Sequence, residues 1–135
     1  MIRVSTPDGV APPIGCYSHL AVIPAGTDLL YLAGQVGMMP DGSVPDDATA
    51  QYIQALRNIL AILASEGCDA RHIAKLNTFL VEPLDLAKIG EVRLSLLGGA
   101  VSPATLVYVP RLANPQFLVE IEAFAAKPAV RDQQS

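Results

Sequence analysis

Two glutamates, Glu120 and Glu122, are the residues of this chain whose type and spacing most clearly suggest chemistry. They lie two positions apart in the segment 117–125, whose other residues are mostly apolar and typical of a buried strand. Because successive side chains of a strand point to opposite faces, the two carboxylates share one face and the alternating apolar residues share the other. A carboxylate that reaches water can accept a proton from a water molecule that attacks a substrate. The polar face is therefore a candidate site, and a strand with one solvated face is the alternative.

Arg93 is the second notable residue, because it interrupts an apolar stripe. A helix predicted up to about Leu97 places Arg93 on the same face as Leu86 and Ile89, where an inward apolar surface would normally continue. A cation at this position either faces a site or snorkels to the surface, where it can form an ion pair at an interface. The sequence alone leaves both readings open.

Residues that bind metals or act as nucleophiles are sparse. His19 and His72 are far apart and have no companion ligands at metal spacing, so we expect no metal site, and nothing in the chain indicates a cofactor. Cys16 and Cys68 do not form a disulfide framework and suit a reducing compartment. Because no base is visible in the sequence to activate Cys16, we expect it to be a small buried hydrophobe.

The pattern of apolar residues predicts the elements that position these side chains. Alternation, helical spacing, and glycine and proline punctuation divide the chain into strands and helices. The predicted strands span residues 18–23, 29–33, 73–81, 105–109 and 117–125, and the predicted helices span 47–66 and 83–97. The first two strands should form a hairpin through Pro24–Asp28. The order β-β-α-β-α-β-β predicts an α+β fold, a mixed sheet with two helices on one face.

Composition indicates one compact domain over residues 1–127, followed by a loose tail, 128–135. Of the 135 residues, 51% are hydrophobic and 16% charged, which is typical of a chain that buries much of its surface. No apolar run approaches the ~20 residues that span a bilayer, so we expect no membrane segment and a cytoplasmic location. The net charge of −4 and the lack of a basic stripe make nucleic acid an unlikely partner.

Four short segments in a fixed order resemble one known family. They are Ile14-Gly15-Cys16-Tyr17-Ser18, Leu32-Ala33-Gly34-Gln35, Pro103-Ala104-Thr105 and Val119-Glu120-Ile121-Glu122-Ala123. In this order they resemble the Rid superfamily of reactive-intermediate enamine/imine deaminases, also named YjgF/YER057c/UK114 or L-PSP endoribonucleases. The resemblance covers nearly the whole chain, about residues 12–126. It implies a chorismate-mutase-like homotrimer with small-molecule sites in the clefts between subunits.

The resemblance also implies roles for three residues. Glu120 matches the glutamate thought to hold the attacking water, and Tyr17 matches a tyrosine that lines the cleft. Gly34 matches a glycine whose backbone lies against the ligand, where the lack of a side chain permits close approach. From the residues alone, a packing role for Tyr17 and a strand-end role for Gly34 remain alternatives.

The chain departs from the family where the deaminating branch has an arginine, because Thr105 occupies that position. Only a guanidinium offers the planar two-point fork that fixes a substrate carboxylate, and a threonine offers one hydroxyl. Val107 also removes polarity from the expected cleft. In relatives the stretch around Arg93 faces the cleft and has an asparagine where this chain has Gly90, which would leave room beside Arg93.

These observations favour hydrolysis or deamination of a small enamine or imine other than the usual 2-aminoacrylate type. Glu120 and Tyr17 are the expected catalytic residues, and Gly34, Thr105, Val107 and Arg93 are the expected substrate-binding residues. A non-catalytic trimer that binds a small metabolite or a partner is the main alternative. An endoribonuclease is the third.

Overall fold

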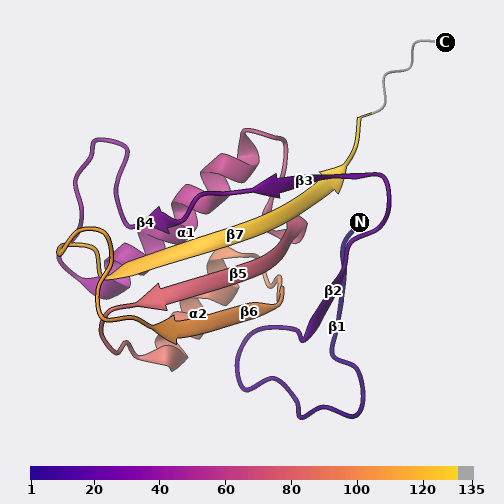
Figure 1. Ribbon diagram of the computed structural model, residues 1–135, viewed down its shortest axis with the longest axis horizontal. Helices are drawn as coiled ribbons and strands as arrows, with labels where there is room; N and C mark the ends of the chain where they lie inside the picture. The colour runs from indigo at the N-terminus through magenta and orange to yellow at the C-terminus, as the bar shows by residue number, and fades with distance from the viewer. Residues whose placement is uncertain (131–135) are drawn as a thin grey trace.

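The computed structural model describes residues 1–130, which form one main mixed sheet with two helices packed on one of its faces and a small separate sheet of two strands (Figure 1). The C-terminal tail expected over 128–135 lies largely outside the described residues. The elements, in chain order, are β1 (Arg3–Ser5), β2 (Leu20–Val22), β3 (Thr27–Tyr31), β4 (Gln35–Val36), α1 (Ala48–Ala64), a 3-10 turn η1 (Ala70–His72), β5 (Ile73–Leu80), α2 (Leu86–Leu96), β6 (Ala104–Tyr108) and β7 (Val119–Pro128). The predicted α+β class with two helices on one face is confirmed.

The main sheet has the strand order β3-β7-β5-β6, and the short β4 also pairs with β7. β5 and β6 run parallel, and the pairs that involve β7 are antiparallel. A parallel pair needs a crossover, and α2 supplies it between β5 and β6. The sheet therefore has one face covered by α1 and α2 and one face without a covering helix (Figure 1).

Both helices begin at an aspartate that caps the first turn. The Asp47 carboxylate accepts a hydrogen bond from the Ala50 backbone N–H at 2.9 Å, and the Asp85 carboxylate accepts one from Lys88 N–H at 3.3 Å. These caps satisfy backbone donors that a helix start leaves unpaired. Past the end of α1, Gly67 has φ of +70°, a conformation that glycine adopts without steric cost.

The central strand β7 shows the alternation predicted from sequence. Val119, Ile121 and Ala123 are fully buried beneath the helices, whereas Glu120 and Glu122 are half-buried on the other face. Burial of Val or Ile side chains stabilises the fold by about 1.5–3 kcal/mol each. The two glutamates are therefore held in place by a strand whose other face anchors the core.

The predicted hairpin between residues 18–23 and 29–33 is wrong. β2 pairs instead with β1 in a separate two-stranded sheet, with Val22 opposite Arg3, and β3 pairs with β7. The connection between β2 and β3 contains Pro24, whose ring fixes φ and biases the residue before it toward extended backbone. β1 and β4 were not predicted either, because strands of two or three residues are too short to show alternation.

Candidate functional site

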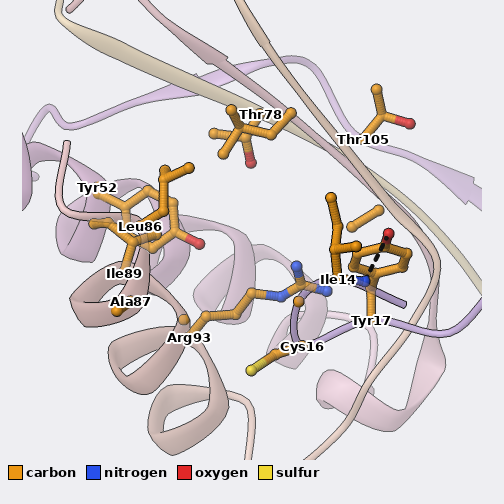
Figure 2. Close-up of a pocket in the computed structure, with 14 residues that line it drawn as sticks. Ile14, Cys16, Tyr17, Tyr52, Thr78, Leu86, Ala87, Ile89, Arg93 and Thr105 are labelled. Carbon is orange, nitrogen blue, oxygen red and sulfur yellow. Dashed lines mark hydrogen bonds between the residues drawn. The ribbon is translucent and has the colours of Figure 1, made fainter. Parts of the chain in front are cut away.

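A cavity of about 690 Å³ lies between α2, β6 and the segment 14–17 that precedes β2 (Figure 2). α2 contributes an apolar wall that includes Leu86 and Ile89, together with the side chain of Arg93. A volume of this size falls within the range of small-molecule sites, about 300–1,000 Å³. The cavity lies on the helix-covered side of the sheet.

Arg93 extends from α2 into this cavity and is incompletely satisfied there. Its Nη2 donates a hydrogen bond to the Ser102 carbonyl oxygen at 3.2 Å, whereas its Nε is buried and has no hydrogen-bond partner. Within residues 1–130, no carboxylate forms an ion pair with the guanidinium. Partial burial lowers the pKa of Arg93, but an arginine remains protonated at neutral pH. The cavity therefore contains a positive charge without a counter-ion from its own chain.

Tyr52 and Cys16 are two further polar groups near Arg93. Tyr52 is 2% exposed, and its burial raises the pKa of its phenol to about 12, so the hydroxyl stays neutral. The Cys16 sulfur would lie 3.6 Å from a Cβ added to Gly90, so the segment before β2 packs on α2 at that glycine. The space that Gly90 leaves is bordered by Cys16 as well as by Arg93.

Tyr17 lines the same cavity (Figure 2). Its hydroxyl accepts a hydrogen bond from the Ile14 backbone N–H at 3.3 Å, and its ring meets the His19 ring edge-on. The phenol is thus oriented by its own loop and retains a proton that it can donate to a ligand.

Glu120 lies on the other face of the sheet, directly against Gly34. A Cβ added to Gly34 would overlap the Glu120 Oε2 atom and would lie 2.8 Å from its Cδ. The absence of a side chain at Gly34 therefore makes room for the carboxylate. No hydrogen bond or ion pair within residues 1–130 engages the Glu120 carboxylate, whereas the Glu122 carboxylate accepts a hydrogen bond from the Asn77 side-chain amide at 3.2 Å.

Thr105 and Val107 share the uncovered face with Glu120. The Lys75 ammonium donates a hydrogen bond to the Thr105 hydroxyl at 2.9 Å. In the strand register, Phe79 is opposite both Glu120 on β7 and Val107 on β6. The three side chains therefore form one row, and neighbouring strands in such a row are about 4.8 Å apart.

The predicted site residues thus form two groups separated by the sheet. Tyr17 and Arg93 line the cavity on the helix side, and Glu120 and Gly34 are in contact on the uncovered side. Thr105 borders both groups. It is one of the residues that line the cavity, and its hydroxyl accepts a hydrogen bond from Lys75 on the uncovered side.

The sequence analysis missed two polar residues near these groups. Lys75 lies two and four positions before Asn77 and Phe79 on the same strand, so its side chain points to the same face as theirs. This alternation could have predicted that its charge lies on the uncovered face. Tyr52 falls on the apolar face of α1, where an aromatic residue gives no sign that it borders a cavity.

No group of three or more His, Cys, Asp or Glu residues that could hold a metal ion occurs in residues 1–130. No helix in the same range is long and apolar enough to cross a membrane.

Residues 9–127 match the sequence model of the family described as endoribonuclease L-PSP. The chain belongs to this family. This match confirms the resemblance to the Rid superfamily, whose members share the L-PSP name. A RutC family protein of Pyrococcus horikoshii is 35% identical over 129 residues, which cover 94% of this chain and 99% of the relative.

Relatives with a named activity and solved structures extend the comparison. The 2-iminobutanoate/2-iminopropanoate deaminase of Rattus norvegicus is 29% identical over 116 residues, 84% of this chain and 82% of the relative. A Rid family protein from Yersinia pestis superposes with a TM-score of 0.83 at 26% identity and covers 93% of this chain and 98% of its own. E. coli TdcF with bound serine superposes with a TM-score of 0.68 at 26% identity, with the same coverage of the two chains.

Proposed function

We propose that this Rid-family chain hydrolyses a small enamine or imine and releases ammonia. The observation that carries the reaction is the Glu120 carboxylate, which lies on the uncovered face beside Gly34 and has no partner within residues 1–130. A carboxylate without a partner can bind water, whereas one in an ion pair, such as Glu66 with Lys127, cannot do so as freely. Deaminases of 2-iminobutanoate and 2-iminopropanoate among the relatives support the reaction class.

The chemistry requires one water molecule and one proton acceptor. With the imine nitrogen protonated, the water oxygen forms a bond to the imine carbon, Glu120 accepts a proton from that water, and the C=N π electrons move to nitrogen, which gives a neutral carbinolamine. Glu120 then returns its proton to the nitrogen, and the carbon–nitrogen bond breaks as the C=O bond forms. The carbinol proton passes to Glu120 or to solvent, so that the products are a carbonyl compound and ammonia. Tyr17 donates its hydroxyl proton in a hydrogen bond that orients the substrate.

Arg93 binds the anionic end of the substrate in this proposal. Its side chain lines a cavity with apolar walls and has no ionic partner within residues 1–130, and a carboxylate is the ligand that matches the planar guanidinium fork. Thr105 offers one hydroxyl, already bound to Lys75, at the place where the deaminating branch has its arginine. The carboxylate is thus held at a different point, so the preferred substrate differs in shape from 2-aminoacrylate-type imines.

Val107 and Gly34 set the remaining walls of the site. Val107 is 41% exposed beside Phe79 and gives an apolar contact in line with Glu120. Because the groups around Arg93 and Glu120 lie on opposite faces of one sheet, one copy cannot bring them together. A homotrimer in which the cavity of one copy faces the Glu120 of another copy satisfies this requirement.

A non-catalytic binding protein is the second candidate, and the cavity itself favours it. A cation with apolar walls binds a small carboxylate whether or not Glu120 takes part. The two candidates differ in their dependence on Glu120. Nothing in the structure favours the endoribonuclease over either.

The test is ammonia release from imines generated in situ by an amino-acid oxidase. We expect the wild type to accelerate release and Glu120→Gln to lower kcat by about 10²- to 10⁴-fold, the usual contribution of a general base. Glu122→Gln is the matched control and should keep most activity, because Glu122 is bonded to Asn77. An active Glu120→Gln variant would remove the proposed role, and no acceleration by the wild type with any imine would favour the binding protein.

2-Aminoacrylate, generated in the same assay, tests the substrate preference. We expect the wild type to process it about 30- to 1,000-fold more slowly than an arginine-bearing relative, since the lost charged fork is worth a few kcal/mol. Equal rates would show that another group does the work of that arginine.

A further inference from the structure

The N-terminal hairpin, β1 and β2, is separate from the main sheet (Figure 1). It consists of two strands of three residues each, and an isolated two-stranded hairpin is marginally stable in water. Leu20 at the start of β2 is 44% exposed, and Ile23 just after it is 41% exposed. β2 is hydrogen-bonded to β1 on one side only, and although β2 also lies near β5, its other backbone edge is not hydrogen-bonded to any strand within residues 1–130.

The main sheet has a matching free edge at β3. β3 is the end strand of the order β3-β7-β5-β6, and only its β7 side is paired in the described chain. Leu29 is 54% exposed and Tyr31 is 72% exposed along this strand. An exposed edge with apolar side chains is a template for another strand.

The chain's own β2 is held away from this edge. The segment just before β2 packs on α2, where Cys16 meets Gly90, and it forms a wall of the cavity. Only residues 23–26 connect β2 to β3, and Pro24 makes this connection stiff. A short, stiff connection is the condition under which an element pairs with another copy rather than with its own chain.

We propose that β2 of each chain pairs antiparallel with β3 of a second copy, so that the hairpin of one chain extends the sheet of its neighbour. Facing residues in an antiparallel pair have numbers with a constant sum, so Val22 opposite Thr27 places Ala21 opposite Asp28. Each chain offers one donor edge and one acceptor edge. Such a head-to-tail contact closes into a ring when the rotation between copies closes, and a ring of three copies would match the proposed trimer.

The exchange joins the two separated groups of site residues, and this consequence rests on the proposed function. In the same register Tyr17 lies opposite Leu32 of the partner subunit. Gly34 of the partner subunit follows two residues later and contacts that subunit's own Glu120. Strand exchange therefore brings the Tyr17 and Arg93 cavity of one chain to the Gly34 and Glu120 pair of the next.

Engineered disulfides test the pairing without any assay of activity. In a background with Cys16→Ser and Cys68→Ala, one chain carries Ala21→Cys with an affinity tag, and a second chain carries Asp28→Cys. The two chains are co-expressed, purified by the tag and oxidised with copper phenanthroline. We expect a disulfide-linked pair of chains on a non-reducing gel, at least tenfold more abundant than with the control chain Tyr108→Cys.

Tyr108 suits the control because it is 51% exposed on β6, the opposite edge strand of the sheet. A link to Tyr108→Cys as strong as the link to Asp28→Cys would overturn the proposal, since it would indicate random collision or pairing at β6. If a variant does not fold by circular dichroism, Leu20→Cys with Leu29→Cys tests the same register.

A single chain that carries both Ala21→Cys and Asp28→Cys distinguishes pairing of β2 with β3 of another copy from pairing of β2 with β3 of the same chain. We expect links between chains in this variant as well. A link found only within single chains would overturn the proposal and restore the ordinary hairpin. Complete absence of links in folded protein would overturn it too. None of these outcomes depends on whether the protein hydrolyses an imine.

Discussion

Two polar side chains on the helix-covered side of the sheet, Gln51 on α1 and Arg93 on α2, differ in how fully their hydrogen-bonding groups are satisfied. Gln51 is 1% exposed, and its amide donates to the carbonyl oxygens of Pro45 and Gln116 at 2.8 and 2.9 Å. Its Oε1 accepts from the Leu118 backbone N–H at 2.8 Å. Arg93 has one hydrogen bond, to a carbonyl oxygen, and a buried Nε with none.

The difference separates a structural polar group from the group that we propose binds the ligand. A buried polar group without a partner costs about 1–3 kcal/mol, so folds satisfy such groups unless another role keeps them. Gln51 ties the loops before α1 and before β7 to the helix. Arg93 makes no comparable set of contacts, and its side chain lines a cavity.

Removal of the Gln51 amide should have the largest effect on stability. Gln51→Ala loses three hydrogen bonds at about 1 kcal/mol each and leaves backbone groups unpaired, so we expect a loss of about 3 kcal/mol in the free energy of unfolding. Urea denaturation measures it. Gln54→Ala, which removes only a contact to Asn58 on the same helix, is the control and should cost less than about 0.5 kcal/mol. Equal effects of the two substitutions would contradict a special role for Gln51.

Gly34→Ala should act on Glu120 rather than on the fold. The added methyl group overlaps the end of the Glu120 side chain, which can rotate away, so we expect a stability loss below about 1 kcal/mol. The displaced carboxylate should lower kcat for ammonia release by about tenfold or more. Adding Gly34→Ala to Glu120→Gln should then cause no further loss. If the double variant instead loses as much activity as the two single variants combined, Gly34 acts independently of Glu120.

Much of this architecture could be predicted from the sequence wherever the periodic pattern of apolar residues extends over many positions. The α1 stripe and the alternation of β7 extend over many residues, so the burial of their apolar residues and the position of Glu120 on the face opposite the core follow from periodicity alone. The predicted hairpin between residues 18–23 and 29–33 was wrong because turn residues indicate a bend but do not decide which strand pairs with which. That choice depends on the tertiary packing of distant segments, which no local pattern reveals.

The candidate site was predictable residue by residue but not as an arrangement. Helical spacing shows that Arg93 is a charge on an otherwise apolar helix face, and strand alternation shows that Glu120 lies on the polar face of an otherwise apolar strand. That they lie on opposite faces of the sheet follows only from the packing of α2. The lysine that binds Thr105 is 30 positions away in sequence and becomes its neighbour only because β5 and β6 run parallel.

Tyr52 tests whether Arg93 lacks a counter-ion, because its phenol lies near Arg93 and would be a counter-ion if it ionised. Burial raises the pKa of Tyr52 from 10.0 to about 12 in the folded protein. Below pH 10 both states are protonated, and between pH 10 and 12 only the unfolded state ionises, so stability falls as pH rises through that window. We expect the wild type to lose about 1 kcal/mol more than Tyr52→Phe between pH 9 and pH 11. Stability that rises over this range relative to Tyr52→Phe would indicate a phenolate paired with Arg93.

Arg93→Met should change the free energy of unfolding least. It replaces a partly buried cation that lacks an ionic partner by an apolar side chain of similar length, an exchange that is often neutral or stabilising. We expect a change within about 0.5 kcal/mol of zero or a gain, measured by urea denaturation. A loss as large as that for Gln51→Ala would show that Arg93 is a structural residue.

The most direct test of the account is the affinity of the protein for 2-oxobutanoate, the carboxylate product of 2-iminobutanoate hydrolysis, measured by isothermal titration calorimetry. The wild type should bind it, and Arg93→Met should weaken binding by about 30- to 1,000-fold, the value of a charged two-point contact. Thr105→Arg, which restores a guanidinium on the other face, tests the alternative position. Binding that Arg93→Met leaves within about twofold of the wild type, and that Thr105→Arg strengthens, would contradict the claim that this chain holds its anionic ligand through Arg93.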